Sequence, residues 1–330
     1  MSWDDHTRDL LQMTNVFRRE TPRPIIGLGH SMGGTNILQL ALLHPRLFSS
    51  IVVIEPHIIK AHSKGMNFAP TYLLTQRRDI WTTKEAAVAD ARKGGLQRTW
   101  DPRVVELWRK HALRELPTLL YPEVPTSLNP ERESGSAPVT LATTKHAEVR
   151  AYGRQAYPAP GQLLASFTPL HPTHPDLSKA EHDQMQAPLY RPELVHTYRQ
   201  LPFLRPSCLF LYGGHSTFYS ARPNVRQEML STVGTQPGGN GGTHTGRTKL
   251  RVVDGGGHFV VFEDPAAVAA QAGLWLRKEV ERFQLDEEIE CRGWVDLGTR
   301  EKAMVDDAWK HWVKEWYDRK ATSRKASSKL

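Results

Sequence analysis

The sequence predicts an α/β protein with a mainly parallel sheet, and three observations support this prediction. An apolar run at residues 25–28 leads through a glycine-rich bend into a helical pattern at 33–43. A second apolar run follows at 48–54, and the same strand-like pattern returns at 207–212 and 250–253. Strands that alternate with helices in this order are typical of parallel strands joined by crossover helices.

Further helices are expected at both ends of this pattern. Residues 4–17 predict a helix because Leu10, Met13 and Phe17 lie on one face at helical spacing. A second amphipathic helix is predicted from Pro265 to about residue 283.

A long segment, residues 58–202, interrupts the alternation of strands and helices. It is rich in Pro, His, Arg and Trp and predicts mostly helices and loops, with helical candidates at 86–91 and 104–116. Residues 121–139 are loop-like. The Gly- and Thr-rich residues 234–247, later in the chain, predict a mobile surface loop.

The bend after the first apolar run carries a serine that suggests chemistry. Gly29, Ser31 and Gly33 are spaced as G-x-S-x-G between a strand and a helix, which is the nucleophile-elbow pattern. We expect both glycines to be needed where backbone approaches backbone. The helix would point its N-terminus at a developing negative charge, so the N–H of Met32 is the natural oxyanion donor. The alternative is a glycine-rich turn whose serine only caps the helix.

A serine hydroxyl needs a base, and the sequence offers fifteen histidines. His258 follows the strand at 250–253 and three glycines, which places it at the carboxyl edge where α/β sites gather. We therefore expect His258 to be the base. His30 is expected to pack behind the elbow. His44, His57 and His215 are expected in turns or on the surface, and His57 is also a binding candidate.

The third member of such a site must be a carboxylate that orients the histidine. The strand at 207–212 is followed by no acid within the next residues. Glu55 follows the strand at 48–54 and should emerge at the same edge as Ser31, so Glu55 is the predicted acid. Two alternatives stay open: Glu55 is a surface residue, or Asp254 takes the acid role.

These residues support a family resemblance. The segments that carry it are 27–34 around Ser31, His44-Pro45-Arg46-Leu47-Phe48, Glu55-Pro56 and Gly257-His258-Phe259. The chain resembles the α/β-hydrolase superfamily and, more narrowly, the fungal peroxisomal AB-hydrolase-1 proteins of the host-selective-toxin biosynthesis type and the fungal peroxisomal lipases. The resemblance implies a core at 1–57 and 203–285, and a cap at 58–202 over an apolar acyl pocket. It also implies that no metal and no organic cofactor is needed.

The chain departs from the superfamily at its N-terminal side. Members normally carry several strands before the elbow strand, and an early loop supplies the second oxyanion N–H. Here the first helix directly precedes the elbow strand, so we expect a fold that is N-terminally truncated. The open edge of the elbow strand is an association hazard: either a partner chain covers it, with a second copy of this chain as one candidate, or the chain is a shortened version of a longer protein. Losing one oxyanion donor costs roughly 3–4 kcal/mol of transition-state stabilisation.

Composition excludes several classes of partner. The net charge is +8, but the basic residues are spread along the 330 residues and no nucleic-acid-binding signature occurs, so no nucleic acid is expected. No apolar run is long enough for a transmembrane segment, and the N-terminus lacks a signal-peptide pattern. Cys208 and Cys291 form no disulfide framework and fit a reducing compartment.

The C-terminal region, residues 286–330, is predicted as a helical extension with a targeting tail. Its last residues, Ser328-Lys329-Leu330, form a receptor-read address, so we expect a peroxisomal import receptor as partner and the peroxisome as location. The alternative is an incidental ending. Trp309, Trp312 and Trp316 share one helical face, which either packs on the body of the protein or meets a partner or a membrane surface.

The predicted function is that of a serine hydrolase acting on carboxylic esters or thioesters through an acyl-enzyme. The substrate classes expected are acyl lipids, acyl-CoA thioesters and secondary-metabolite intermediates. The alternative is a catalytically silent binding or scaffold protein that keeps the elbow and lacks the front of the fold.

Overall fold

The computed structural model describes residues 2–61, 68–94, 96–124, 137–152, 154–155, 189–217 and 223–327. The chain divides into two units, Met1–Glu279 and Val280–Leu330, which are taken in turn. The first unit holds the predicted sheet and the helices that cover it.

Four parallel strands form the main sheet. They are β1 (Ile26–His30), β2 (Ser50–Ile54), β8 (Ser207–Gly213) and β9 (Thr248–Val253), in the spatial order β1-β2-β8-β9. All three pairings are parallel, so the carboxyl ends of the strands meet at one edge of the sheet. The predicted parallel α/β sheet is therefore confirmed. Among the described residues β1 is an edge strand, and its Leu28 is 56% exposed.

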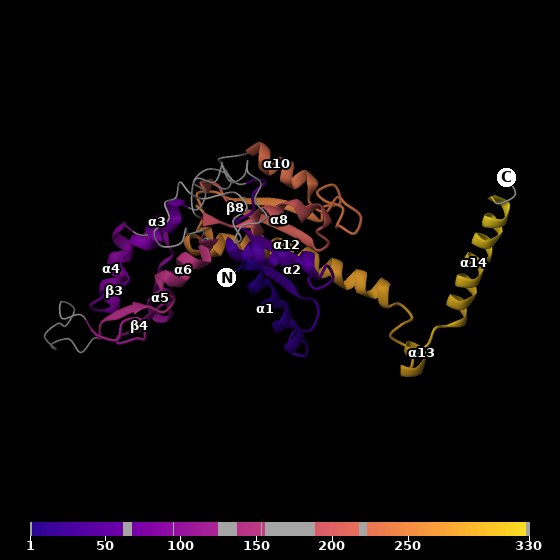
Figure 1. Cartoon of the computed structure of the whole chain (residues 1–330), viewed down its shortest axis with the longest axis horizontal. Coiled ribbons are helices and arrows are strands. Elements are labelled where there is room, and N and C mark those ends of the chain that lie inside the picture. The colour runs from indigo at the N-terminus through magenta and orange to yellow at the C-terminus, as the bar shows by residue number, and fades with distance from the viewer. Residues whose placement is uncertain are drawn as a thin grey trace, which may run out of the picture. The chain divides into compact units, whose positions relative to one another are not determined.

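Helices cover both faces of this sheet (Figure 1). Those around it are α1 (Trp3–Val16), α2 (Met32–Leu43), α8 (Pro192–Gln200), α10 (Pro223–Thr232), α11 (Val260–Glu263) and α12 (Pro265–Cys291), with the 3-10 turn η4 (Leu201–Phe203). One buried cluster joins Leu38 of α2 to Phe210 of β8, and another joins Leu209 of β8 to Trp275 of α12. Because both faces are covered, β2 and β8 are buried along their whole length, as continuous apolar strands require.

The segment 58–202 contains short strands that the sequence does not predict. Its described elements are α3 (Phe68–Gln76), β3 (Ile80–Trp81), α4 (Lys84–Gly94), η1 (Leu96–Thr99), α5 (Pro102–His111), β4 (Leu113–Glu115), β5 (Val139–Leu141), α6 (Lys145–Tyr152), β6 (Arg154–Gln155) and β7 (Leu189–Tyr190). The predicted helix at 104–116 is wrong at its end, because Leu113 enters an antiparallel sheet of order β3-β5-β4. Leu113 is buried in one cluster with Trp81 and Val139, so cross-strand packing decides the conformation at Leu113. The assignment of 58–202 as a cap stays a prediction.

The Gly- and Thr-rich stretch at 234–247 contains no helix or strand, as expected of a loop, and forms a hydrogen-bonded series of turns. Asn240 is buried at its centre, donates from Nδ2 to the carbonyl of Pro206 at 2.9 Å, and accepts from the N–H of Gly242 at 2.7 Å. A buried amide that is satisfied on both sides holds the turns together.

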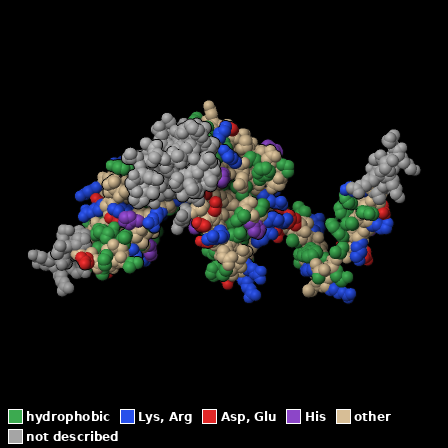
Figure 2. Space-filling view, viewed as in Figure 1, with side chains coloured by type: hydrophobic (Ala, Val, Ile, Leu, Met, Phe, Trp, Pro, Cys, Tyr) green, Lys and Arg blue, Asp and Glu red, His purple; other side chains and the backbone are tan. Residues whose placement is uncertain are grey.

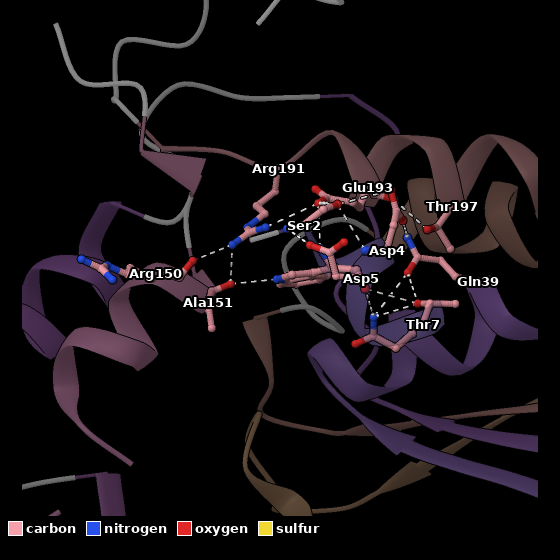
Figure 3. Close-up of polar contacts among 12 residues, drawn as sticks. Ser2, Asp4, Asp5, Thr7, Gln39, Arg150, Ala151, Arg191, Glu193 and Thr197 are labelled. Atoms are coloured by element: carbon pink, nitrogen blue, oxygen red, sulfur yellow. Dashed lines mark hydrogen bonds and ion pairs between the residues drawn. The ribbon is translucent and has the colours of Figure 1, made fainter. Parts of the chain in front are cut away.

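A polar cluster fastens the start of α1 to two segments far along the chain (Figure 3). Glu193 accepts hydrogen bonds from the Ser2 hydroxyl at 2.6 Å and from the Trp3 N–H at 2.9 Å. The carbonyl of Ala151 accepts from the Trp3 indole at 2.8 Å and from the Arg191 guanidinium at 2.9 Å. Burial by itself raises the pKa of Glu193, but these hydrogen bonds and the charge of Arg191 together lower it, so the carboxylate is ionised.

The second unit begins within α12 and continues through α13 (Thr299–Ala303) to α14 (Asp307–Ser327). The predicted tryptophan-bearing helix is thus present as α14. No described helix is long and apolar enough to cross a membrane. The tripeptide Ser328-Lys329-Leu330 lies outside the described residues.

Candidate active site

The serine bend lies where β1 gives way to α2. Ser31 has φ 53° and ψ −116°, a conformation that non-glycine residues rarely adopt. A Cβ on Gly29 would lie 2.4 Å from the carbonyl oxygen of Gly33, so only glycine fits at position 29. A Cβ on Gly33 would meet no described atom within 4 Å, so the steric need predicted for that glycine is wrong.

The structure brings together the three residues predicted for catalysis. His258 Nε2 lies 3.0 Å from Ser31 Oγ, and His258 Nδ1 lies 3.2 Å from Glu55 Oε2. We call this arrangement the Ser31–His258–Glu55 relay. The residues come from the carboxyl ends of β1, β9 and β2, so the parallel sheet places all three at one edge.

Glu55 is fully buried and accepts hydrogen bonds on both oxygens. Oε1 accepts from the Gly213 N–H at 2.7 Å, and Oε2 accepts from the Ser216 hydroxyl at 2.5 Å. The alternative of a surface glutamate is therefore wrong. Asp254, the other candidate acid, is exposed, while the contact with His258 Nδ1 comes from Glu55.

Backbone strain marks the same two positions. Among the described non-glycine residues, only Ser31 and Glu55 have positive φ, at 53° and 49°. A residue held in this region costs roughly 1–3 kcal/mol and persists only where the surroundings enforce it. Both strained residues lie in the relay, which is where strain that serves a function is expected.

The loop that carries His258 is positioned by groups that the sequence analysis does not identify. A Cβ on Gly213 would lie 2.4 Å from the carbonyl oxygens of Gly256 and Gly257, so this close crossing needs a glycine at the end of β8. The Gly257 N–H donates to the Glu263 carboxylate at 2.6 Å. The crossing at Gly213 joins residues that are distant in sequence, so no local pattern predicts it.

His30 does more than pack behind the bend. Its Nε2 lies 2.7 Å from the backbone carbonyl of His258, and only an N–H can bond to that oxygen, so Nε2 carries the proton. Burial lowers the pKa of His30, although the bond to the carbonyl opposes this, and the ring is neutral near pH 7. His30 thus holds the main chain of His258.

His57 lies next to the bend and not in an exposed turn. Its N–H donates to the Ser31 carbonyl at 3.3 Å, and its ring contacts the edge of Trp3 with centroids 6.0 Å apart. Burial, with a smaller contribution from His258, lowers the pKa of His57 to about 4, so the ring is uncharged near neutral pH. His44 and His215 are exposed, as expected.

Aromatic rings line one side of the His30 imidazole. His30 contacts Phe262 edge-on at 5.7 Å between centroids, and Trp100 stacks on Phe262 at 4.6 Å. The N–H of Asp101 also donates to the Phe262 carbonyl at 2.8 Å. The segment 58–202 therefore rests on the helix that follows His258 and forms an apolar wall near it.

The remaining elements of the site concern charge. Met32 is the first residue of α2, so its N–H has no acceptor within the helix and faces the helix N-terminus. Among the described ranges no group of three or more His, Cys, Asp or Glu side chains is arranged to hold a metal ion.

This geometry and fold define an α/β hydrolase, and the chain belongs to the alpha/beta hydrolase family, whose family model matches residues 1–271. The family resemblance drawn from the sequence is confirmed. The chain is 39% identical over 293 residues to the type I acyl-CoA thioesterase mpaH of Penicillium roqueforti, covering 86% of this chain and 65% of that protein. It thus spans less than two thirds of that relative. It is 27% identical to the abhydrolase domain-containing protein AFT2-1 of Alternaria alternata, covering 88% of this chain and 98% of that protein.

A solved structure shows the same fold at low sequence identity. The peroxisomal alpha-beta-hydrolase Lpx1 of Saccharomyces cerevisiae superposes with a TM-score of 0.55 at 16% identity, over 99% of this chain and 70% of that one.

Proposed function

We propose that this chain is a serine hydrolase of carboxylic esters or thioesters, with Ser31 as nucleophile, His258 as base and Glu55 as the acid that orients it. The observation that carries the proposal is the Ser31–His258–Glu55 relay. Its distances allow His258 Nε2 to accept the Ser31 proton while Glu55 holds His258 Nδ1. Burial of Glu55 supports it, because a carboxylate held by three contacts keeps one imidazole orientation.

The first half of the reaction forms an acyl-enzyme. Ser31 Oγ attacks the acyl carbon while His258 Nε2 accepts the hydroxyl proton, and Glu55 stabilises the resulting imidazolium. The carbonyl electrons move onto the oxygen, which the Met32 N–H and the N-terminus of α2 stabilise. Cleavage of the C–S or C–O bond then releases the thiol or alcohol, which takes the proton from His258.

The second half restores the serine. Water loses a proton to His258 Nε2 and attacks the acyl carbon of the Ser31 ester. The bond to Ser31 Oγ breaks, Oγ recovers the proton from His258, and the carboxylic acid leaves. Burial lowers the pKa of His30 and of His57, so both rings are uncharged near neutral pH. They therefore place no additional positive charge beside the imidazolium.

An acyl thioester, and in particular an acyl-CoA, is the substrate class we favour. The Penicillium roqueforti relative bears the name of an acyl-CoA thioesterase at 39% identity. The stacked rings of Trp100 and Phe262 lie next to His30, whose ring contacts His258, and offer an apolar surface for an acyl chain, with the segment 58–202 as its cap. We further propose import into peroxisomes through Ser328-Lys329-Leu330, which fits the peroxisomal origin stated for the Lpx1 structure.

A fluorophosphonate probe tests the proposed chemistry, because it labels only a serine that a base activates. We expect labelling of the full chain, loss of labelling in Ser31→Ala and in His258→Gln, and unchanged labelling in Ser231→Ala, a control at an exposed serine. Well-folded protein that is not labelled would instead identify a catalytically silent binding protein.

Self-association through the edge of β1 is a separate proposal. Leu28 is exposed on this strand, which has no further strand beside it among the described residues. We expect the mass in solution to exceed that of one chain and Leu28→Lys to lower it. A single-chain mass in both proteins would contradict the proposal.

A further inference from the structure

The proposed hydrolase leaves one feature of the chain unused, the aromatic face of α14. We propose that this face docks on the surface of a phospholipid bilayer with anionic headgroups. The proposal does not depend on the hydrolase activity, since it concerns only the second unit.

The aromatic face consists of five side chains on one side of α14: Trp309, Trp312, Val313, Trp316 and Tyr317. The three tryptophans are 56%, 57% and 53% exposed, and Tyr317 is 68% exposed. A shallow, open hollow of about 440 Å³ lies on one flank of this face, between Trp309, Val313 and Tyr317 on one side and Lys310 and Lys314 on the other. Figure 2 shows hydrophobic side chains in green along this helix, with lysines and arginines beside them. The buried hydrophobic clusters found among the described residues include none from this unit.

The kinds of side chain favour a lipid surface over another helix. A helix that pairs with a second helix usually presents a seam of leucine and isoleucine. The aromatic face has neither, and instead presents three indoles and a phenol, which combine an apolar ring with a polar N–H or O–H. Such rings are enriched at the level of lipid headgroups, where one end is apolar and the other hydrated.

The charge of the helix complements an anionic surface. Residues 319–329 contain five basic residues and no acidic ones. Lys320 Nζ lies 4.6 Å from the centroid of the Trp316 ring, so a cation accompanies the aromatic face at its C-terminal end. Lys310 and Lys314 line the hollow and pair with exposed carboxylates, and such pairs are weak enough to exchange for lipid phosphates.

The opposite side of α14 is polar, as expected of a helix that lies flat on a membrane surface. Asp307 and Asp318 project from it, both more than half exposed. A helix with one aromatic face, one charged face and flanking lysines is the pattern of interfacial helices. Each Lys or Arg near an anionic surface strengthens binding by about fivefold.

Vesicle flotation of the full chain tests the proposal, with vesicles of phosphatidylcholine alone and of phosphatidylcholine mixed with phosphatidylserine. We expect binding to the mixed vesicles only, a blue shift of tryptophan fluorescence on binding, and weaker binding at high salt. Replacing Trp309, Trp312 and Trp316 together by Ala should weaken binding at least about tenfold. Replacing Lys320 and Arg324 by Gln should weaken it about thirtyfold.

Matched controls come from the first unit. Leu119→Ala with Leu274→Ala removes exposed apolar side chains, and Arg8→Gln with Arg103→Gln removes exposed charges, so neither pair should change binding. Circular dichroism establishes that each variant is folded. Three outcomes would each overturn the proposal: no binding to the mixed vesicles, equal binding to both kinds of vesicle, or equal losses of binding in the variants and the controls. A dimer that the triple tryptophan variant abolishes, without vesicle binding, would also overturn it and identify a contact between copies.

Discussion

Replacing Glu55 by glutamine perturbs the relay most directly, because it keeps the size of the side chain and removes its charge. The carboxylate contacts the Gly213 N–H, the Ser216 hydroxyl and His258 Nδ1. A glutamine offers one acceptor oxygen, and its NH2 group is a donor. The Gly213 N–H cannot turn away, so the amide oxygen stays with it and the NH2 group faces His258.

The magnitude follows from the tautomer. When Nδ1 must accept from an NH2 group, the proton of the neutral imidazole resides on Nε2, where it faces Ser31 and cannot accept the hydroxyl proton. The same change in serine proteases lowers kcat about 10⁴-fold, or about 5.5 kcal/mol in activation free energy. We expect a loss of this size in kcat of Glu55→Gln, with little change in KM, measured as thiol release from an acyl-CoA.

The control is Asp254→Asn, at the other candidate acid. Asp254 is exposed, so its variant should keep kcat within about twofold of the parent chain, as surface substitutions usually do. Equal and small losses in the two variants would remove Glu55 from the mechanism. A large loss in Asp254→Asn alone would assign the acid role to that residue instead.

Three further predictions concern groups around the relay. The pKa of His57 is about 4 in the folded chain and 6.5 in the unfolded chain, so the free energy of unfolding that is present above pH 6.5 falls as the pH falls toward 4. Urea unfolding should show a loss of about 3 kcal/mol at pH 4 that His57→Gln lacks. Parallel losses in the parent chain and in His57→Gln would refute this. Gly213→Ala should displace the His258 loop and lower kcat/KM at least about a hundredfold, whereas Gly273→Ala, with open space around its Cβ, should not. His30→Phe should lower kcat more than about tenfold with little effect on KM, and partial rescue by Asn would support the role of its hydrogen bond.

The sequence predicts the main sheet well because its strands are continuous apolar runs. β2 and β8 are buried on both faces, so every residue carries the signal. Short strands of the segment 58–202 carry no such signal, because three residues are too few to show a period. Leu113 is read as the end of a helix for this reason, although its pairing with Leu141 makes it part of a strand. Pairing of this kind depends on a partner that is distant in the sequence.

The candidate site divides in the same way. Ser31 belongs to a local pattern, and Glu55 and His258 are identified by their places after strands, so all three can be selected from the sequence, while their roles stay predictions. The supporting contacts cannot be selected, because Ser216 and Gly213 have no motif of their own. Their role exists only once β8 lies beside β2, which brings a donor to each oxygen of Glu55.

The strand order explains why an acid after β2 can serve when β8 ends without one. In the order β1-β2-β8-β9, the end of β2 adjoins the end of β1, which carries Ser31. His258 arrives from β9 on a loop that crosses the end of β8, where Gly213 leaves room for its backbone. The imidazole therefore reaches over β8 to a carboxylate on β2, and β8 contributes hydrogen-bond donors where an acid would otherwise stand. An acid introduced after β8 would bring a second carboxylate close to Glu55, so two like charges would compete for one imidazole.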